Sequence, residues 1–178
     1  ETPVILMGYL NPIESFGYPD FVNKASQCGA NGVLLVDSPP EESQQLLGLL
    51  AEKNMHQIFL VAPTTTDERI NYIMQSASGF VYYVALKGVT GSADLDSDAV
   101  KKDVLKLKAA GGNTASIPVA VGFGVKDAAS AVSVAEQADA VVIGSALVKL
   151  LGQCEDEDSL LAAIETFLKP IRNALNSL

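Results

Sequence analysis

The chain has 178 residues, 48% of them hydrophobic, so it can bury a substantial core and is expected to fold as a globular protein. Its formal net charge of −9 argues against nucleic acid as a partner, because binding a phosphate backbone needs clustered Lys and Arg. No apolar run reaches the roughly 18 residues of a membrane-spanning helix, and the N-terminus lacks the pattern of a signal peptide, so a cytoplasmic location is expected.

Apolar runs and amphipathic stretches alternate along the chain. Runs rich in Val, Ile, Leu and Tyr predict strands at 3–9, 32–37, 57–62, 79–85, 117–123 and 139–144. Amphipathic stretches predict helices at 18–30, 40–54, 66–77, 98–111, 127–138 and 156–178. Continuous apolar strands are typical of parallel sheets covered on both faces, so the sequence predicts a single α/β domain over 1–178. In the last helix, Asp156 or Asp158 is expected to cap the start and Pro170 to kink the end.

The cysteines and the histidine, the residues most often found in metal and redox sites, do not form a recognisable site pattern. Cys28 and Cys154 lie far apart without metal-ligand spacing, so they are interpreted as buried or half-buried thiols, and no metal is expected. The single histidine, His56, lies where a helix gives way to a strand. Strand beginnings lie opposite the active face of α/β folds, so His56 is interpreted as part of a solvated turn.

Two consecutive strands end in glycine. The run ending at Gly122-Phe123-Gly124 is followed about one βα unit later by a run ending at Gly144-Ser145, which turns straight into a helix. Glycine lets backbone N–H groups approach an oxyanion, and a helix N-terminus adds unpaired donors. The pair therefore favours a phosphate site, although tight turns and close packing would also explain each glycine alone. In a closed barrel such a site is commonly made by the loops after the seventh and eighth strands.

Five motifs resemble one known family, the α subunit of tryptophan synthase. They are LMGYLNP (6–12), DSPPEES (37–43), KGVTGS (87–92), GFGV (122–125) and GSALV (144–148). The resemblance covers the whole chain and implies barrel strands three to eight of a (βα)8 TIM barrel. It further implies cleavage of indole-3-glycerol phosphate to indole and glyceraldehyde 3-phosphate, without metal or organic cofactor. The implied partner is a β subunit, which carries pyridoxal phosphate, in an α2β2 complex.

Carried over residue by residue, the resemblance implies a phosphate site and an indole pocket. The phosphate-binding positions are Gly91, Gly124, Gly144 and Ser145. The indole-lining positions are Leu6, Leu34, Leu60, Tyr82 and Phe123, which would otherwise be read as barrel core. Tyr9 and Asn11 follow the first strand of this chain and are weaker site candidates. Asp37 also ends a strand, but it is interpreted as a structural carboxylate that bonds loop N–H groups.

The segment 86–98 resembles the family's mobile loop. Thr90 matches a position whose hydroxyl supports a catalytic carboxylate when the loop closes. Many family members have Arg two residues before GVTG, where this chain has Leu86 followed by Lys87. Lysine lacks the planar fork of donors, so whether Lys87 replaces that Arg stays open.

The family's two catalytic carboxylates have no match in the 178 residues. The resemblance places both before residue 1, where one protonates indole C3 and handles the glycerol hydroxyl while the other stabilises the protonated ring nitrogen. Eight βα units need about 250 residues, so the first two units are expected to be missing and the chain alone to be nearly inert. The alternative is a non-catalytic phosphate-binding fragment. Other phosphate-binding barrels, of histidine or thiamine biosynthesis, are disfavoured by DSPPEES and KGVTGS.

Overall fold

The computed structural model describes residues 2–85, 97–110, 117–122 and 124–178. The chain forms two compact units. Unit 1 comprises Glu1–Tyr82 and Ala110–Ile117, and unit 2 comprises Tyr83–Ala109 and Pro118–Leu178. The single domain predicted over 1–178 stays a prediction. No helix in the described ranges is long and apolar enough to cross a membrane.

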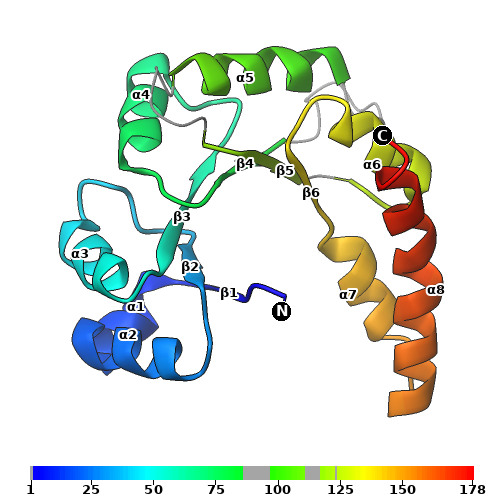
Figure 1. Cartoon of the computed structure of the whole chain (residues 1–178), viewed down its shortest axis with the longest axis horizontal. Coiled ribbons are helices and arrows are strands. Elements are labelled where there is room, and N and C mark those ends of the chain that lie inside the picture. The colour runs from blue at the N-terminus through cyan, green and yellow to red at the C-terminus, as the bar shows by residue number, and fades with distance from the viewer. Residues whose placement is uncertain (1, 86–96, 111–116, 123) are drawn as a thin grey trace. The chain divides into compact units, whose positions relative to one another are not determined.

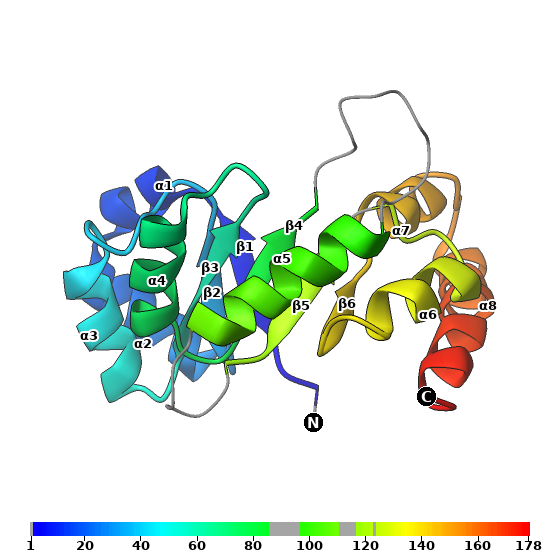
Figure 2. The same cartoon turned by 90° about the horizontal axis from the view of Figure 1, so that it is seen from above.

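Unit 1 is built on parallel strands alternating with helices. Its order is β1 (Ile5–Gly8), α1 (Leu10–Phe16), α2 (Tyr18–Gln27), β2 (Gly32–Leu35), α3 (Gln44–Glu52), β3 (His56–Val61) and α4 (Asp67–Ser76). Strand β1 pairs in parallel with β2, and β2 with β3. Figures 1 and 2 both show α2, α3 and α4 on one side of these strands. The parallel α/β arrangement predicted from the apolar runs is confirmed.

The core of unit 1 lies between these strands and helices. Val33 and Leu35 of β2 pack with Val22 of α2 and with Leu46 and Leu50 of α3, and all five side chains are buried. These residues recur at helical spacing in α3 and on alternate positions in β2, so each element turns one apolar face inward. Burial of apolar surface at about 25 cal/mol per Å² is what holds such layers together.

Unit 2 follows the same alternation. Strand β4 (Val81–Val84) lies at the boundary of the two units and precedes α5 (Ser97–Ala110). Then come β5 (Val119–Gly122), α6 (Ala128–Ala135), β6 (Ala140–Val142), α7 (Ser145–Leu151) and α8 (Glu157–Leu175). Strands β5 and β6 are parallel, and α8 packs against both α6 and α7 (Figure 1).

Local capping explains where several helices begin. Asp127 precedes α6 and Asp156 precedes α8, and each forms a reciprocal capping box with the serine three residues on. Thr66 caps α4 by accepting from the Arg69 N–H, and Asp67 and Glu68 in the first turn complement the helix dipole. Of the two caps predicted for the last helix, Asp156 is confirmed.

Two details differ from the sequence-based prediction. Helix α1 was not predicted; its seven residues make about two turns and include Pro12. Helix α8 contains Pro170 and continues past it to Leu175, and the kink predicted there stays a prediction. Cys28 is exposed at the end of α2, so its predicted burial is wrong, whereas Cys154 is half-buried as predicted, and both thiols are free. His56 is exposed at the start of β3, which agrees with a solvated position.

Candidate functional site

The two glycine turns lie at the same edge of the strand pair in unit 2. Gly122, the last residue of β5, pairs with Val142, the last residue of β6. Gly124 and Gly144 each follow two residues later. Because the strands are parallel and in this register, both turns leave from the carboxyl edge of adjacent strands, where α/β proteins bind ligands.

The backbone conformation calls for glycine at 124 but not at 144. Gly124 has φ +66°, a left-handed conformation that disfavours other residues. Gly144 has φ −116°, and a Cβ placed on it would meet nothing within 4 Å. Packing therefore does not demand glycine at 144, and the exposed backbone there faces open space. Gly144 is the N-cap of α7 and the exposed Ser145 is its first residue, so backbone N–H groups of the helix start are available to an anion.

The opposite edge of the same strand pair is tied together by a carboxylate. Asp139, just before β6, accepts from the Val119 N–H at 2.9 Å and from Lys108 Nζ at 2.9 Å. Burial alone raises the pKa of Asp139, but the hydrogen bonds from Lys108 and Val119 outweigh it, and the pKa lies below its ordinary value. These contacts fix the relative position of β5 and β6, and so of the turns at their other ends.

Strand register in unit 1 separates the leucines assigned to the indole pocket. Leu34 pairs with Met7 on one side and with Ile58 on the other, and Leu60 lies two residues after Ile58. Paired residues of parallel strands share a face and alternate residues return to it, so Met7, Leu34 and Leu60 lie on one face. Leu6 pairs with Val33, whose face packs against the helices. Leu6, 40% exposed, is therefore on the other face from Leu34, a placement that sequence reasoning could not reach without the register.

The two tyrosines of β4 point to opposite faces of the strand. The Tyr83 hydroxyl donates to the Asp103 carboxylate of α5, which places Tyr83 on the helix-covered side. Tyr82 is the next residue along the strand, so its half-buried side chain points to the opposite face. Burial raises the pKa of the Tyr82 phenol, so the hydroxyl is neutral and can donate a hydrogen bond at physiological pH.

The weaker candidates lie where β1 meets α1. Tyr9 is the N-cap of α1 and 65% exposed, and Asn11 is exposed in its first turn. Tyr9 makes no side-chain capping bond. Instead, Asp37 Oδ1 accepts from the Leu10 N–H at 2.7 Å, which agrees with a structural role for this carboxylate, although the N–H belongs to the first residue of α1 rather than to a loop.

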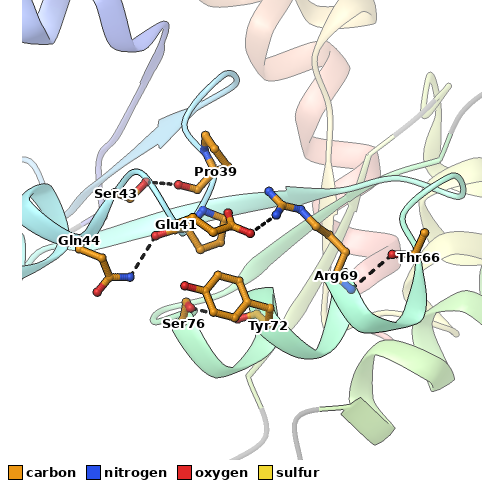
Figure 3. A network of polar contacts seen from close by, with 9 residues as sticks. Pro39, Glu41, Ser43, Gln44, Thr66, Arg69, Tyr72 and Ser76 are labelled. Carbon is orange, nitrogen blue, oxygen red and sulfur yellow. Dashed lines mark hydrogen bonds and ion pairs between the residues drawn. The ribbon is translucent and has the colours of Figure 1, made fainter.

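A cavity of about 480 Å³ opens beside Leu60, at the carboxyl ends of β2 and β3. Its walls are the segment 35–40, the threonines at 64–66 and the α4 residues Arg69 and Ile73. Figure 3 shows Glu41 and Arg69 reaching toward one another, where they form an ion pair between the loop and α4. The cavity thus lies between the loops that follow the neighbouring strands β2 and β3.

Three of the assigned positions lie outside the described residues: Thr90, Gly91 and Phe123. Of the others, the structure brings Gly124, Gly144 and Ser145 to one edge in unit 2, and Leu34 and Leu60 to one face in unit 1. Met7 shares that face and was missed, because its place depends on pairing between strands. In the described part of the chain, no group of three or more His, Cys, Asp or Glu side chains is arranged to hold a metal ion.

The chain alternates parallel strands with helices, so it is an α/β protein. The glycine turns at the carboxyl edge of β5 and β6 give it a candidate phosphate-binding edge. Comparison with known proteins identifies the family to which the chain belongs within this class. The family model described as tryptophan synthase alpha chain matches residues 1–176. The chain belongs to the tryptophan synthase alpha chain family, as its motifs predicted.

Individual similar proteins support this family assignment. The tryptophan synthase alpha chain of Acinetobacter baumannii is 48% identical over 178 residues, which is 100% of this chain and 65% of the relative. The crystal structure of tryptophan synthase subunit alpha from Legionella pneumophila superposes with a TM-score of 0.84 at 39% identity, over 100% of this chain and 64% of that one. A structure of tryptophan synthase from M. tuberculosis matches with a TM-score of 0.82 at 31% identity, over 97% of this chain and 61% of that one. The chain thus spans just under two thirds of the length of these relatives.

Proposed function

We propose that this chain carries the substrate-binding part of a tryptophan synthase α subunit, which cleaves indole-3-glycerol phosphate to indole and glyceraldehyde 3-phosphate. The observation that carries the proposal is the pairing of Gly122 with Val142, because it sets the two glycine turns side by side. The family match over residues 1–176 supplies the substrate. In this proposal the six strands are the third to eighth of an eight-stranded barrel.

The proposed phosphate site uses backbone groups rather than cations. Open backbone at Gly144, the Ser145 hydroxyl and the first N–H groups of α7 would hold the phosphate oxygens, with Gly124 shaping the adjoining turn. Gly91 is assigned to the same site from the loop. Such a site suits a chain of net charge −9, since it needs no lysine cluster.

The family resemblance assigns Leu34, Leu60, Tyr82 and Phe123 to the proposed indole pocket, and in unit 1 the first two share one face. Register supports Met7 beside them in place of Leu6. A flat apolar ring gains most of its binding free energy from burial against such side chains. The Tyr82 hydroxyl would add a neutral hydrogen-bond donor.

The chemical step needs groups that this chain does not match. Breaking the bond between indole C3 and the glycerol side chain requires a proton delivered to C3 and a proton removed from the adjacent hydroxyl. General acid–base help of this kind is worth about 10²- to 10⁴-fold. Because no carboxylate among the 178 residues matches the family's pair, we propose that the isolated chain binds the substrate without turnover and that Thr90 only supports the missing carboxylate.

The proposed partner is a β subunit, which uses pyridoxal phosphate to consume the indole, in an α2β2 complex in the cytoplasm. The loop around Pro39 is the proposed contact surface. The second candidate is a non-catalytic phosphate-binding fragment, which keeps the glycine turns and the partner-facing loop but performs no chemistry. It is favoured only by the unmatched carboxylates.

Calorimetry on the 178-residue chain separates these functions. Titration with glycerol 3-phosphate and with indole-3-glycerol phosphate should give binding to both, tighter for the latter, and no indole release by chromatography. Absence of binding would reject the site. Indole release at an ordinary enzyme rate would show that our account of the carboxylates is wrong. Addition of a tryptophan synthase β subunit tests the proposed partner itself, because a chain that keeps the partner-facing loop should associate with it.

A further inference from the structure

A buried polar cluster joins β3 to the loop that follows β2. Gln57 of β3 is 0% exposed, Ser43 is 1% exposed and Ser38 is 5% exposed, and these are the buried polar side chains in the described ranges. Gln57 Nε2 lies 3.0 Å from Ser43 Oγ and 3.3 Å from Ser38 Oγ. The two serine oxygens lie 2.7 Å apart. We call these three residues the Gln57 cluster.

The donors and acceptors of the Gln57 cluster can be assigned completely. Ser43 donates its hydroxyl proton to the Pro39 carbonyl at 2.8 Å. Ser38 must therefore donate to Ser43, because Ser43 has no second proton to give. Each serine hydroxyl can therefore only accept a hydrogen bond from Gln57. For this reason the side-chain amide nitrogen of Gln57, which donates, faces the serines, and its oxygen does not.

This assignment leaves one polar atom of the cluster without a partner among the described residues. Gln57 Oε1 is buried, and no side chain or backbone group in the described ranges donates a hydrogen bond to it. A buried acceptor that loses its water without compensation costs stability, whereas an apolar side chain of the same length would avoid that cost. Stability by itself therefore does not explain a glutamine at this position, and the benefit must lie in what Nε2 holds.

Nε2 holds the loop 38–43 through its two serines. This loop contains Pro39 and Pro40, walls of the 480 Å³ cavity, and Glu41, which pairs with Arg69 across to α4 (Figure 3). The two prolines have no N–H, so the loop has few backbone bonds of its own, namely Glu42 N–H to Pro39 O and Ser43 N–H to Pro40 O. The Gln57 cluster replaces the missing backbone bonds.

We propose that Gln57 is a positioning residue, which gives up stability through its unpaired oxygen in order to hold the loop 38–43 in the shape that meets a partner. The identity of that partner as a β subunit rests on the proposed function. The positioning role itself rests only on the contacts of the cluster and on the unpaired Oε1.

Hydrogen exchange followed by NMR tests the positioning role in the 178-residue chain. Gln57→Met keeps the length of the side chain and removes both polar ends. We expect the Glu42 and Ser43 amides to exchange about tenfold faster or more, while amides of β2 are unchanged and Tm is equal or higher. Gln44→Met is the matched control, because Gln44 also donates to this loop, at the Pro40 carbonyl, but from an exposed position where water can replace it.

Two results would overturn the proposal: unchanged exchange at Glu42 and Ser43, or a lowered Tm with faster exchange throughout β2, which is the pattern of an ordinary core residue. Ser43→Ala provides an independent route, since removing the main acceptor should loosen the same two amides. If the effects of Ser43→Ala and Gln57→Met simply add, the cluster does not act as a unit and the proposal fails.

Association with a tryptophan synthase β subunit gives the functional readout. Gln57→Met should weaken association several-fold, while Gln44→Met should leave it within twofold of wild type. Equal affinities for wild type and Gln57→Met would remove the partner role. If the wild-type chain binds no β subunit, the proposed function fails, whereas the exchange result still decides the positioning role.

Discussion

The Asp139 carboxylate accepts a hydrogen bond from the Val119 N–H at 2.9 Å, so a side chain at the start of β6 holds the start of β5. The same carboxylate pairs with Lys108 at 2.9 Å. This relationship lies at the amino ends of the two strands, opposite the glycine turns. It predicts that the geometry of the candidate phosphate edge depends on a residue that never touches the ligand.

Replacing Asp139 with Asn should destabilise the chain by about 0.5–1.5 kcal/mol, because a charge-assisted acceptor becomes a neutral one. The pKa of Asp139 is lowered on folding, so its contribution is complete above its ordinary value of 3.8 and is lost as pH falls through the lower folded value. Urea unfolding between pH 7 and pH 3 should show a smaller acid loss for Asp139→Asn than for wild type. Lys108→Met is the control and should cost less, since the side chains of this ion pair are 34% and 38% exposed.

Two glycines of unit 1 should respond to alanine in opposite directions. A Cβ on Gly32 would lie 2.4 Å from the His56 carbonyl oxygen, so Gly32→Ala must push β2 and β3 apart. We expect a loss of about 1–3 kcal/mol, in the range of overpacked cores. A Cβ on Gly48, within α3, meets nothing within 4 Å, and Gly48→Ala should gain about 0.5–1 kcal/mol. Thermal unfolding of both variants measures this contrast, and destabilisation by Gly48→Ala would contradict it.

Gly144→Val should remove binding of glycerol 3-phosphate while leaving the fold intact. The added side chain has room in the protein, since nothing lies within 4 Å of its Cβ, but it would occupy the space in front of the helix start. Calorimetry should show at least about tenfold weaker binding, equivalent to 1.4 kcal/mol. Val148→Ala, at an exposed position of the same helix, is the control for α7 itself. Unchanged affinity of Gly144→Val would reject the phosphate assignment.

The bond from Tyr83 to Asp103 predicts an alkaline limit to stability. Burial, and then the bond and charge of Asp103, raise the pKa of the Tyr83 phenol above its ordinary value of 10.0. Its contribution is complete below pH 10 and is lost as pH rises, because the unfolded chain releases the proton first. Tyr83→Phe should cost about 1–2 kcal/mol at pH 7 and show a weaker alkaline decline. Tyr72→Phe, at an exposed position, is the control and should leave the free energy of unfolding at pH 7 unchanged.

Much of the fold and of the candidate site could be predicted from local patterns. Apolar runs located β2 and β3 within one or two residues, and Asp156 was recognisable as a helix cap. The motifs around Gly124 and Gly144 pointed to the candidate phosphate edge, and the family they indicated is the one that matches. These features are local, because a strand, a cap or a glycine turn is written in a few consecutive residues.

The sequence by itself therefore determined the α/β class, the family and the presence of two glycine turns. Only the tertiary structure decided that Met7 rather than Leu6 shares a face with Leu34, and that Gln57 holds Ser38 and Ser43. The physical reason is that a side chain's face depends on the register between strands, and a one-residue shift reverses it. The role of the buried Gln57 likewise depends on partners that are distant in sequence and that only folding brings within hydrogen-bond distance.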